Sequence, residues 1–89
     1  MFGLESDELR ACKVAMDLLE NYRSFSPMVG DAITAFKRIG ECIEDPTQEK
    51  VTEAKDLIDQ LTTGIDPYQG YVPSVAVALE KLTKWSESA

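Results

Sequence analysis

The sequence predicts an all-α protein, an antiparallel up-down bundle of four helices. Apolar residues recur at helical spacing in four stretches, and serine, aspartate and proline residues that favour helix starts separate these stretches. No stretch alternates with period two, and no Asn-Gly hairpin turn occurs. With 89 residues, of which 44% are hydrophobic, the chain has enough apolar material for one core but not for two. We therefore expect a single helical domain over residues 1–89.

The first helix is expected over residues 7–23. Ser6 is a typical N-cap, and the acidic Asp7 and Glu8 suit the positive end of the helix dipole. The apolar stripe of this helix comprises Leu9, Cys12, Met16 and Leu19. Its 3-4-3 spacing predicts that one face of the helix is buried.

The second helix is expected over residues 27–44. Ser26 can act as its N-cap, and Pro27 suits the first helical position, where the missing N–H costs nothing. The apolar seam comprises Val29, Ala32, Ile33, Phe36, Ile39 and Ile43. Gly40 lies within this helix and suggests that a neighbouring helix crosses closely there.

The third helix is expected over residues 46–63, with Asp45 as N-cap and Gln48 at the capping-box position. Its heptad comprises Val51, Ala54, Ile58, Leu61 and Ile65. Gly64 follows as the expected C-cap. The helix therefore has both end signals as well as a buried face.

The fourth helix is expected over residues 73–86, after a loop rich in proline, glycine and tyrosine. Its seam comprises Val75, Leu79, Leu82 and Trp85, which places Trp85 in the core. Because the first two turns are short, neighbouring helices must run antiparallel.

The short turns also predict which segments meet at one end of the bundle. The turn at residues 23–26 and the loop at residues 65–73 should lie together there, with several aromatic side chains. The candidate partner-binding residues are Tyr22, Arg23, Phe25, Tyr68, Gln69 and Tyr71. Tyrosine and arginine are enriched among binding hot spots, so this end is a candidate binding surface. Alternatively, the rings cap the core and only their polar atoms reach water.

The charge balance indicates what the chain can bind. Sixteen acidic and nine basic residues give a net charge of −7, which repels nucleic acid and anionic lipid surfaces. We therefore expect a basic protein partner, no nucleic acid and no membrane. An acidic docking face is predicted on the third helix, at Glu49, Glu53, Asp56 and Asp59. The same residues can also form an ordinary solvated face, broken by Lys50 and Lys55.

The sequence lacks the residues that several kinds of catalytic and metal-binding site require. The chain contains no histidine, which excludes imidazole general bases and imidazole metal ligands. Two cysteines are too few for a structural zinc site, and no calcium loop or glycine-rich phosphate loop is present. We expect no catalytic residue, no bound metal and no cofactor. Cys12 and Cys42 are expected to be buried thiols, although a disulfide between them is conceivable.

One enzyme class remains as an alternative, the helical magnesium-dependent nucleotide pyrophosphohydrolases. Their paired acidic motifs are similar to Glu41-x-x-Glu44 and Glu53-x-x-Asp56 here. In an antiparallel helix pair, however, these carboxylates lie at different levels, whereas ligands of one cation must converge. Two further alternatives are a structural homo-oligomer, such as a homodimer, and an inhibitor that mimics nucleic acid through its acidic surface.

In type, the chain resembles the bacteriocin immunity proteins, which are small acidic four-helix bundles. Those directed at colicin nucleases present a tyrosine pair followed by proline between helices, and Tyr68, Tyr71 and Pro73 loosely match this arrangement. The resemblance implies an aromatic anchor on an acidic body that binds a basic target. The leading hypothesis is a non-enzymatic, stoichiometric protein-binding module: an inhibitor, immunity protein or adaptor, cytoplasmic, from a phage or another mobile element.

Overall fold

The structure is a computed structural model, which describes residues 6–68, 70 and 72–88. Its elements are α1 (Asp7–Glu20), α2 (Pro27–Glu44), α3 (Gln48–Ile65), the short 3₁₀ helix η1 (Asp66–Tyr68) and α4 (Pro73–Ser88). No strand occurs in these ranges, and the predicted all-α four-helix bundle is confirmed.

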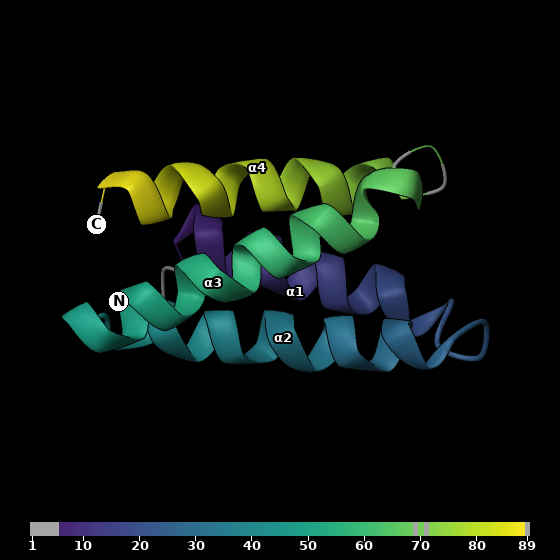
Figure 1. Ribbon diagram of the computed structural model, residues 1–89, viewed down its shortest axis with the longest axis horizontal. Helices are drawn as coiled ribbons and strands as arrows, with labels where there is room; N and C mark the ends of the chain where they lie inside the picture. The colour runs from purple at the N-terminus through teal and green to yellow at the C-terminus, as the bar shows by residue number, and fades with distance from the viewer. Residues whose placement is uncertain (1–5, 69, 71, 89) are drawn as a thin grey trace.

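The four helices form a ring in which each helix packs against two neighbours. α1 packs against α2 and α4, and α3 packs against the same two helices from the other side. The α1–α2 turn and the α3–α4 connection lie at one end of the bundle (Figure 1). We call this end, residues 21–28 and 64–68, the tip. The opposite end, with Ser6, residues 45–48 and Trp85, is called the base.

Side-chain caps fix where three of the helices begin. The Ser6 hydroxyl accepts the Leu9 N–H and the Ser26 hydroxyl accepts the Met28 N–H, both at 3.2 Å, as the sequence predicts. The predicted cap of the third helix is wrong. Thr47 takes this position in an extended conformation, and its hydroxyl accepts the Lys50 N–H at 3.2 Å. The Asp45 carboxylate instead pairs with the Lys50 ammonium group at 2.8 Å.

Three predicted helix ends also differ from the structure. α1 stops at Glu20 rather than at residue 23, because Asn21 and Tyr22 donate to carbonyls three residues back in tight turns. α3 passes through Gly64, and Asp66 follows in a right-handed conformation with its N–H bonded to Thr62. α4 continues to Ser88 rather than ending at residue 86.

The core lies along the axis of the ring and contains side chains from all four helices. Its largest fully buried side chains are Cys12, Phe36, Ile39, Cys42, Val75 and Leu82. Trp85, predicted to be in the core, is only half-buried, whereas its neighbour Ser86 is buried and donates a hydrogen bond to the Thr83 carbonyl. Gly40 is buried against Leu9, and this contact brings α1 and α2 together.

Candidate functional site

The tip displays an aromatic pair formed within the α1–α2 turn. The rings of Tyr22 and Phe25 have centroids 5.6 Å apart and are tilted by 31°. Tyr22 packs against the core, whereas Phe25 is 76% exposed. The turn is held by the Phe25 N–H, which donates to the Tyr22 carbonyl at 3.0 Å. An anchored ring therefore supports a second ring that projects into solvent.

Met28 extends this apolar surface from the turn to the end of α3. It is 56% exposed and lies in the first turn of α2, two residues after the Ser26 cap. A Cβ atom built on Gly64 would lie 4.0 Å from the Met28 methyl group, so the turn and the end of α3 meet at the tip. Met28 is not among the contact residues predicted from the sequence, although its position next to the apolar seam of the second helix was the available signal.

The other predicted tip residues are less fully described. Arg23 pairs with Glu20 at 2.9 Å, and both side chains are exposed. The backbone of Tyr68 belongs to η1, but its side chain lies outside the described part of the structure. Gln69 and Tyr71 also lie outside the described residues. The geometry of the candidate site therefore rests on Tyr22, Phe25 and Met28.

The predicted acidic face of α3 divides into exposed and paired carboxylates. Glu49, Asp56 and Asp59 are exposed. Glu53 accepts two hydrogen bonds from Arg38 of α2, at 2.6 and 2.9 Å, which lowers the pKa of its carboxyl group. Glu53 therefore ties α3 to α2, and three acidic side chains remain for an approaching basic surface.

The acidic motifs of the pyrophosphohydrolase alternative do not form a metal site. Arg38 also binds Glu41 at 3.2 Å, so its guanidinium group stands between Glu41 and Glu53, each from one of the two motifs. Among the described residues, no three cysteine or acidic side chains come together in a way that could hold a metal ion.

Both cysteines are buried free thiols, as the sequence predicts. Burial raises the pKa of Cys12 to about 12 and also raises the pKa of Cys42. A thiol with a raised pKa is a poor nucleophile at neutral pH. Neither side chain is therefore a candidate for covalent chemistry in the folded protein.

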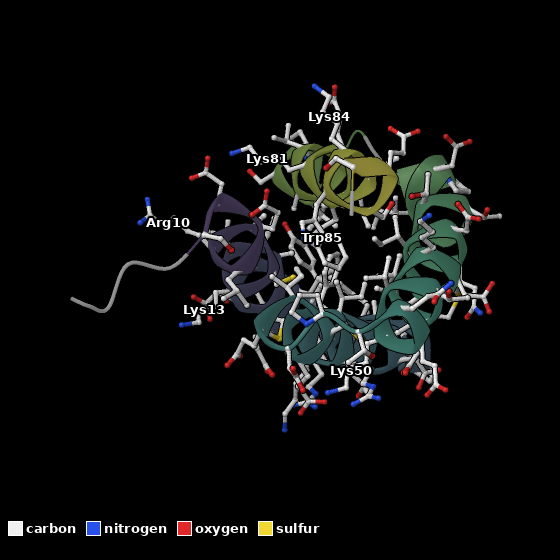
Figure 2. All side chains as sticks on the ribbon, turned by 90° about the vertical axis from the view of Figure 1, so that its left-hand side faces the viewer. Arg10, Lys13, Lys50, Lys81, Lys84 and Trp85 are labelled. Carbon is white, nitrogen blue, oxygen red and sulfur yellow. The ribbon has the colours of Figure 1, made fainter. Side chains whose placement is uncertain are left out.

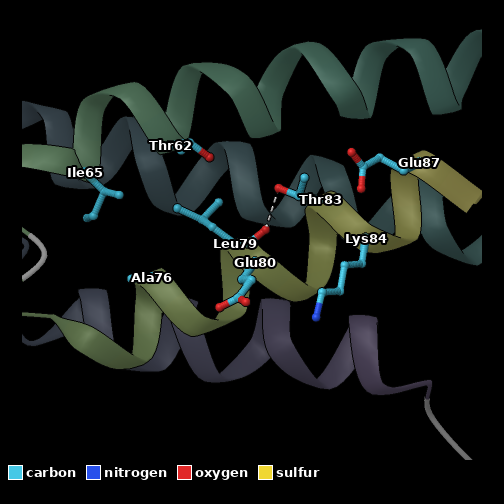
Figure 3. A pocket seen from close by; sticks show the side chains of 8 residues that line it. All are labelled: Thr62, Ile65, Ala76, Leu79, Glu80, Thr83, Lys84 and Glu87. Atoms are coloured by element: carbon cyan, nitrogen blue, oxygen red, sulfur yellow. Dashed lines mark hydrogen bonds between the residues drawn. The ribbon is translucent and has the colours of Figure 1, made fainter.

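Two hollows follow the seam between α3 and α4, and neither is predictable from helical periodicity. The first has a volume of about 340 Å³ and lies over Ile65 and Leu79 (Figure 3). The hydroxyls of Thr62 and Thr83 on its walls donate at 2.8 Å to carbonyls of their own helices. Internal bonding of the hydroxyls makes the walls less polar than their composition suggests.

The second hollow lies at the base and has a volume of about 680 Å³. Its lining comprises Pro46, Thr47, Gln48, Val51, Thr52, Lys55 and Trp85. Figure 2 looks onto this end and shows Trp85 reaching from α4 into the space between the helices. We call this feature the Trp85 hollow. It combines one half-buried aromatic ring with apolar side chains and one lysine.

In the comparisons with known proteins, no family model, curated protein or solved structure matches this chain. Within the described part of the chain, no helix is both long enough and apolar enough to span a bilayer.

Proposed function

We propose that this protein is a non-enzymatic binding module that captures a protein partner stoichiometrically through its tip. The observation that carries the proposal is Phe25, an aromatic side chain 76% exposed and supported by Tyr22. With Met28, 56% exposed, it gives an apolar surface at one pole. Aromatic anchors and adaptable methionines are typical of binding surfaces, and a ring already held in place loses little entropy on binding.

The charge of the chain supports a basic partner. The net charge of −7 attracts a positively charged surface and speeds encounter, an effect that added salt screens. Glu49, Asp56 and Asp59 on α3 are exposed and can contribute to this steering. In this proposal the apolar contacts of the tip provide most of the binding affinity, and the carboxylates increase the rate of association. The module would then act as an inhibitor, an immunity-type protein or an adaptor by occluding the surface that it covers.

Site-specific photo-crosslinking tests the position of the contact. A benzophenone amino acid replaces Phe25 in one variant and Met28 in another, and each is illuminated in extract of the source cells. Val77 on α4 provides the matched control, since it is apolar and 52% exposed but lies outside the tip. We expect one protein adduct from positions 25 and 28 that excess unlabelled protein suppresses. No adduct, or the same adduct from position 77, would contradict the proposal.

The identified partner then allows a quantitative test with purified proteins. Calorimetry should give one binding site per chain, and Phe25→Ala should weaken binding by at least ~1 kcal/mol without loss of helical signal. Tyr68→Ala and Tyr71→Ala are expected to have effects of similar size, because both tyrosines are predicted contact residues. Binding with unchanged affinity in all three variants would exclude the tip as the anchor.

A further inference from the structure

The tip carries a thioether sulfur that is open to solvent. Met28, in the first turn of α2, is 56% exposed and forms the apolar surface of the tip together with Phe25. Oxidation of a methionine to its sulfoxide turns an apolar side chain into a polar one. We propose that Met28 is a reversible oxidation site, and that methionine sulfoxide at this position weakens capture of the partner. This inference rests on the proposed function and concerns the regulation of the same site.

The other sulfur atoms that the structure describes are protected from oxidants. Cys12 and Cys42 are buried, and burial raises the pKa of both thiols, so neither presents a thiolate at neutral pH. Met16 is partly buried and packs against the core from α1. Within residues 6–68, 70 and 72–88, Met28 therefore has the most exposed side chain that contains sulfur. A peroxide should react first at the surface that binds the partner.

The reaction with hydrogen peroxide needs no group other than the thioether. A lone pair on the Met28 sulfur attacks one peroxide oxygen, the O–O bond breaks, and the second oxygen leaves as water with both peroxide protons. The sulfur loses two electrons and the peroxide gains them. A thiol-dependent methionine sulfoxide reductase reverses the change: two thiols form a disulfide, and the sulfoxide oxygen leaves as water.

The exposure of Met28 predicts that oxidation affects binding more than folding. More than half of the side chain already contacts water, so the folded state depends little on its apolar character. A partner that covers the tip must instead remove water from the new sulfoxide oxygen, which costs free energy unless the partner supplies a hydrogen bond. The sulfoxide therefore lowers affinity while the bundle stays intact.

Peptide mapping by mass spectrometry tests the selectivity of the reaction without a partner. The native protein is treated with hydrogen peroxide, catalase stops the reaction, and the digest is analysed over time. Met28 should be oxidised at least about fivefold faster than Met16, and the two rates should converge in urea. The mapping also separates oxidation of Met1, which lies outside the described residues. Equal rates at Met16 and Met28 in the native protein would overturn the inference.

Calorimetry with the partner identified by crosslinking tests the consequence for binding. Peroxide is removed with catalase before the proteins are mixed, and circular dichroism checks that the helical content is kept. Oxidation should weaken binding at least about fivefold, and methionine sulfoxide reductases should restore it. Met28→Leu should bind equally before and after peroxide. Met16→Leu is the matched control and should lose affinity on oxidation like the wild type.

The outcomes separate this inference from the proposed function. Unchanged affinity after complete oxidation of Met28 would overturn the inference, and so would a loss of affinity that persists in Met28→Leu. In both cases the untreated protein still binds its partner through the tip, and the proposed function stands. An untreated wild type that binds no partner through the tip would instead overturn the proposed function and this inference with it.

Discussion

Arg38 and Glu53 join α2 to α3 through two parallel hydrogen bonds, from Nε to Oε2 at 2.6 Å and from Nη2 to Oε1 at 2.9 Å. The pair is bidentate, the geometry in which arginine binds carboxylates best. Both side chains are two-fifths exposed, so water still reaches the charges. We infer that the main role of the pair is to fix the register between α2 and α3, and that its contribution to the free energy of unfolding is small.

This pairing predicts how stability depends on pH. The pKa of Glu53 is lowered in the folded state by Arg38. Its contribution is therefore present above the ordinary carboxyl pKa of 4.5 and is lost as pH falls through the lowered value. Glu53→Gln should lower the urea midpoint at pH 7, and the difference from wild type should vanish in strong acid. Asp17→Asn, at an exposed site where no pairing partner is described, is the control. A difference that persists unchanged at pH 2 would contradict this role.

The contact between Gly40 and Leu9 predicts a stabilising substitution. A Cβ atom at residue 40 would lie 3.7 Å from the Leu9 Cδ2 atom, an ordinary van der Waals contact. Gly40→Ala should therefore raise the free energy of unfolding by about 0.5–1 kcal/mol, because alanine favours the helix and fills space. Gly30→Ala in the same helix is the matched control, since its Cβ would meet nothing within 4 Å. If Gly40→Ala destabilises while Gly30→Ala stabilises, the two helices cross more closely than the structure describes.

Local signals in the sequence predict the helices, because each helix carries its own caps and periodicity. Ser6 and Ser26 bond to N–H groups two or three residues ahead, so their role needs no knowledge of the rest of the fold. Asp45 and Thr47 are both competent caps by residue type, and in the structure Thr47 takes the cap position while Asp45 pairs with Lys50. The Arg38–Glu53 pair, the exposure of Met28 and the Trp85 hollow depend on the register between helices. The periodicity of apolar residues within one helix does not determine how that helix is aligned with its neighbours.

The buried thiols predict slow cysteine labelling in the native state. Burial raises the pKa of Cys12 to about 12, so almost no thiolate exists at pH 8, and the side chain is shielded from reagent. Cys12 and Cys42 should react with a disulfide reagent at least ~1,000-fold more slowly than in urea, at a rate set by opening of the bundle. Mass spectrometry of the labelled protein measures the extent of labelling at each cysteine over time. Rapid labelling of either cysteine in native buffer would show that the α1–α2 side of the core opens readily.

A further pH effect follows from the same cysteine. Because the folded pKa of Cys12 lies above its ordinary value of 9.0, its stabilising contribution is complete below pH 9 and is lost as pH rises toward 12. Cys12→Ala should leave a cavity and be less stable at neutral pH by about 1–2 kcal/mol. The deficit should shrink between pH 9 and pH 11, where only the wild type loses this contribution. Urea unfolding of both proteins over that range measures the change, and a constant deficit would mean that the thiol titrates normally.

Tyr22 and Phe25 allow the two interpretations of the tip, binding surface and core cap, to be separated by stability alone. Tyr22 packs against the core, so Tyr22→Ala should lower the free energy of unfolding by about 1–3 kcal/mol. Phe25 is 76% exposed, so Phe25→Ser should change the free energy of unfolding by less than about 0.5 kcal/mol. Urea unfolding followed by circular dichroism gives both values. A large loss for Phe25→Ser would mean that the ring stabilises the fold, and the interpretation of Phe25 as a contact residue would lose its physical basis.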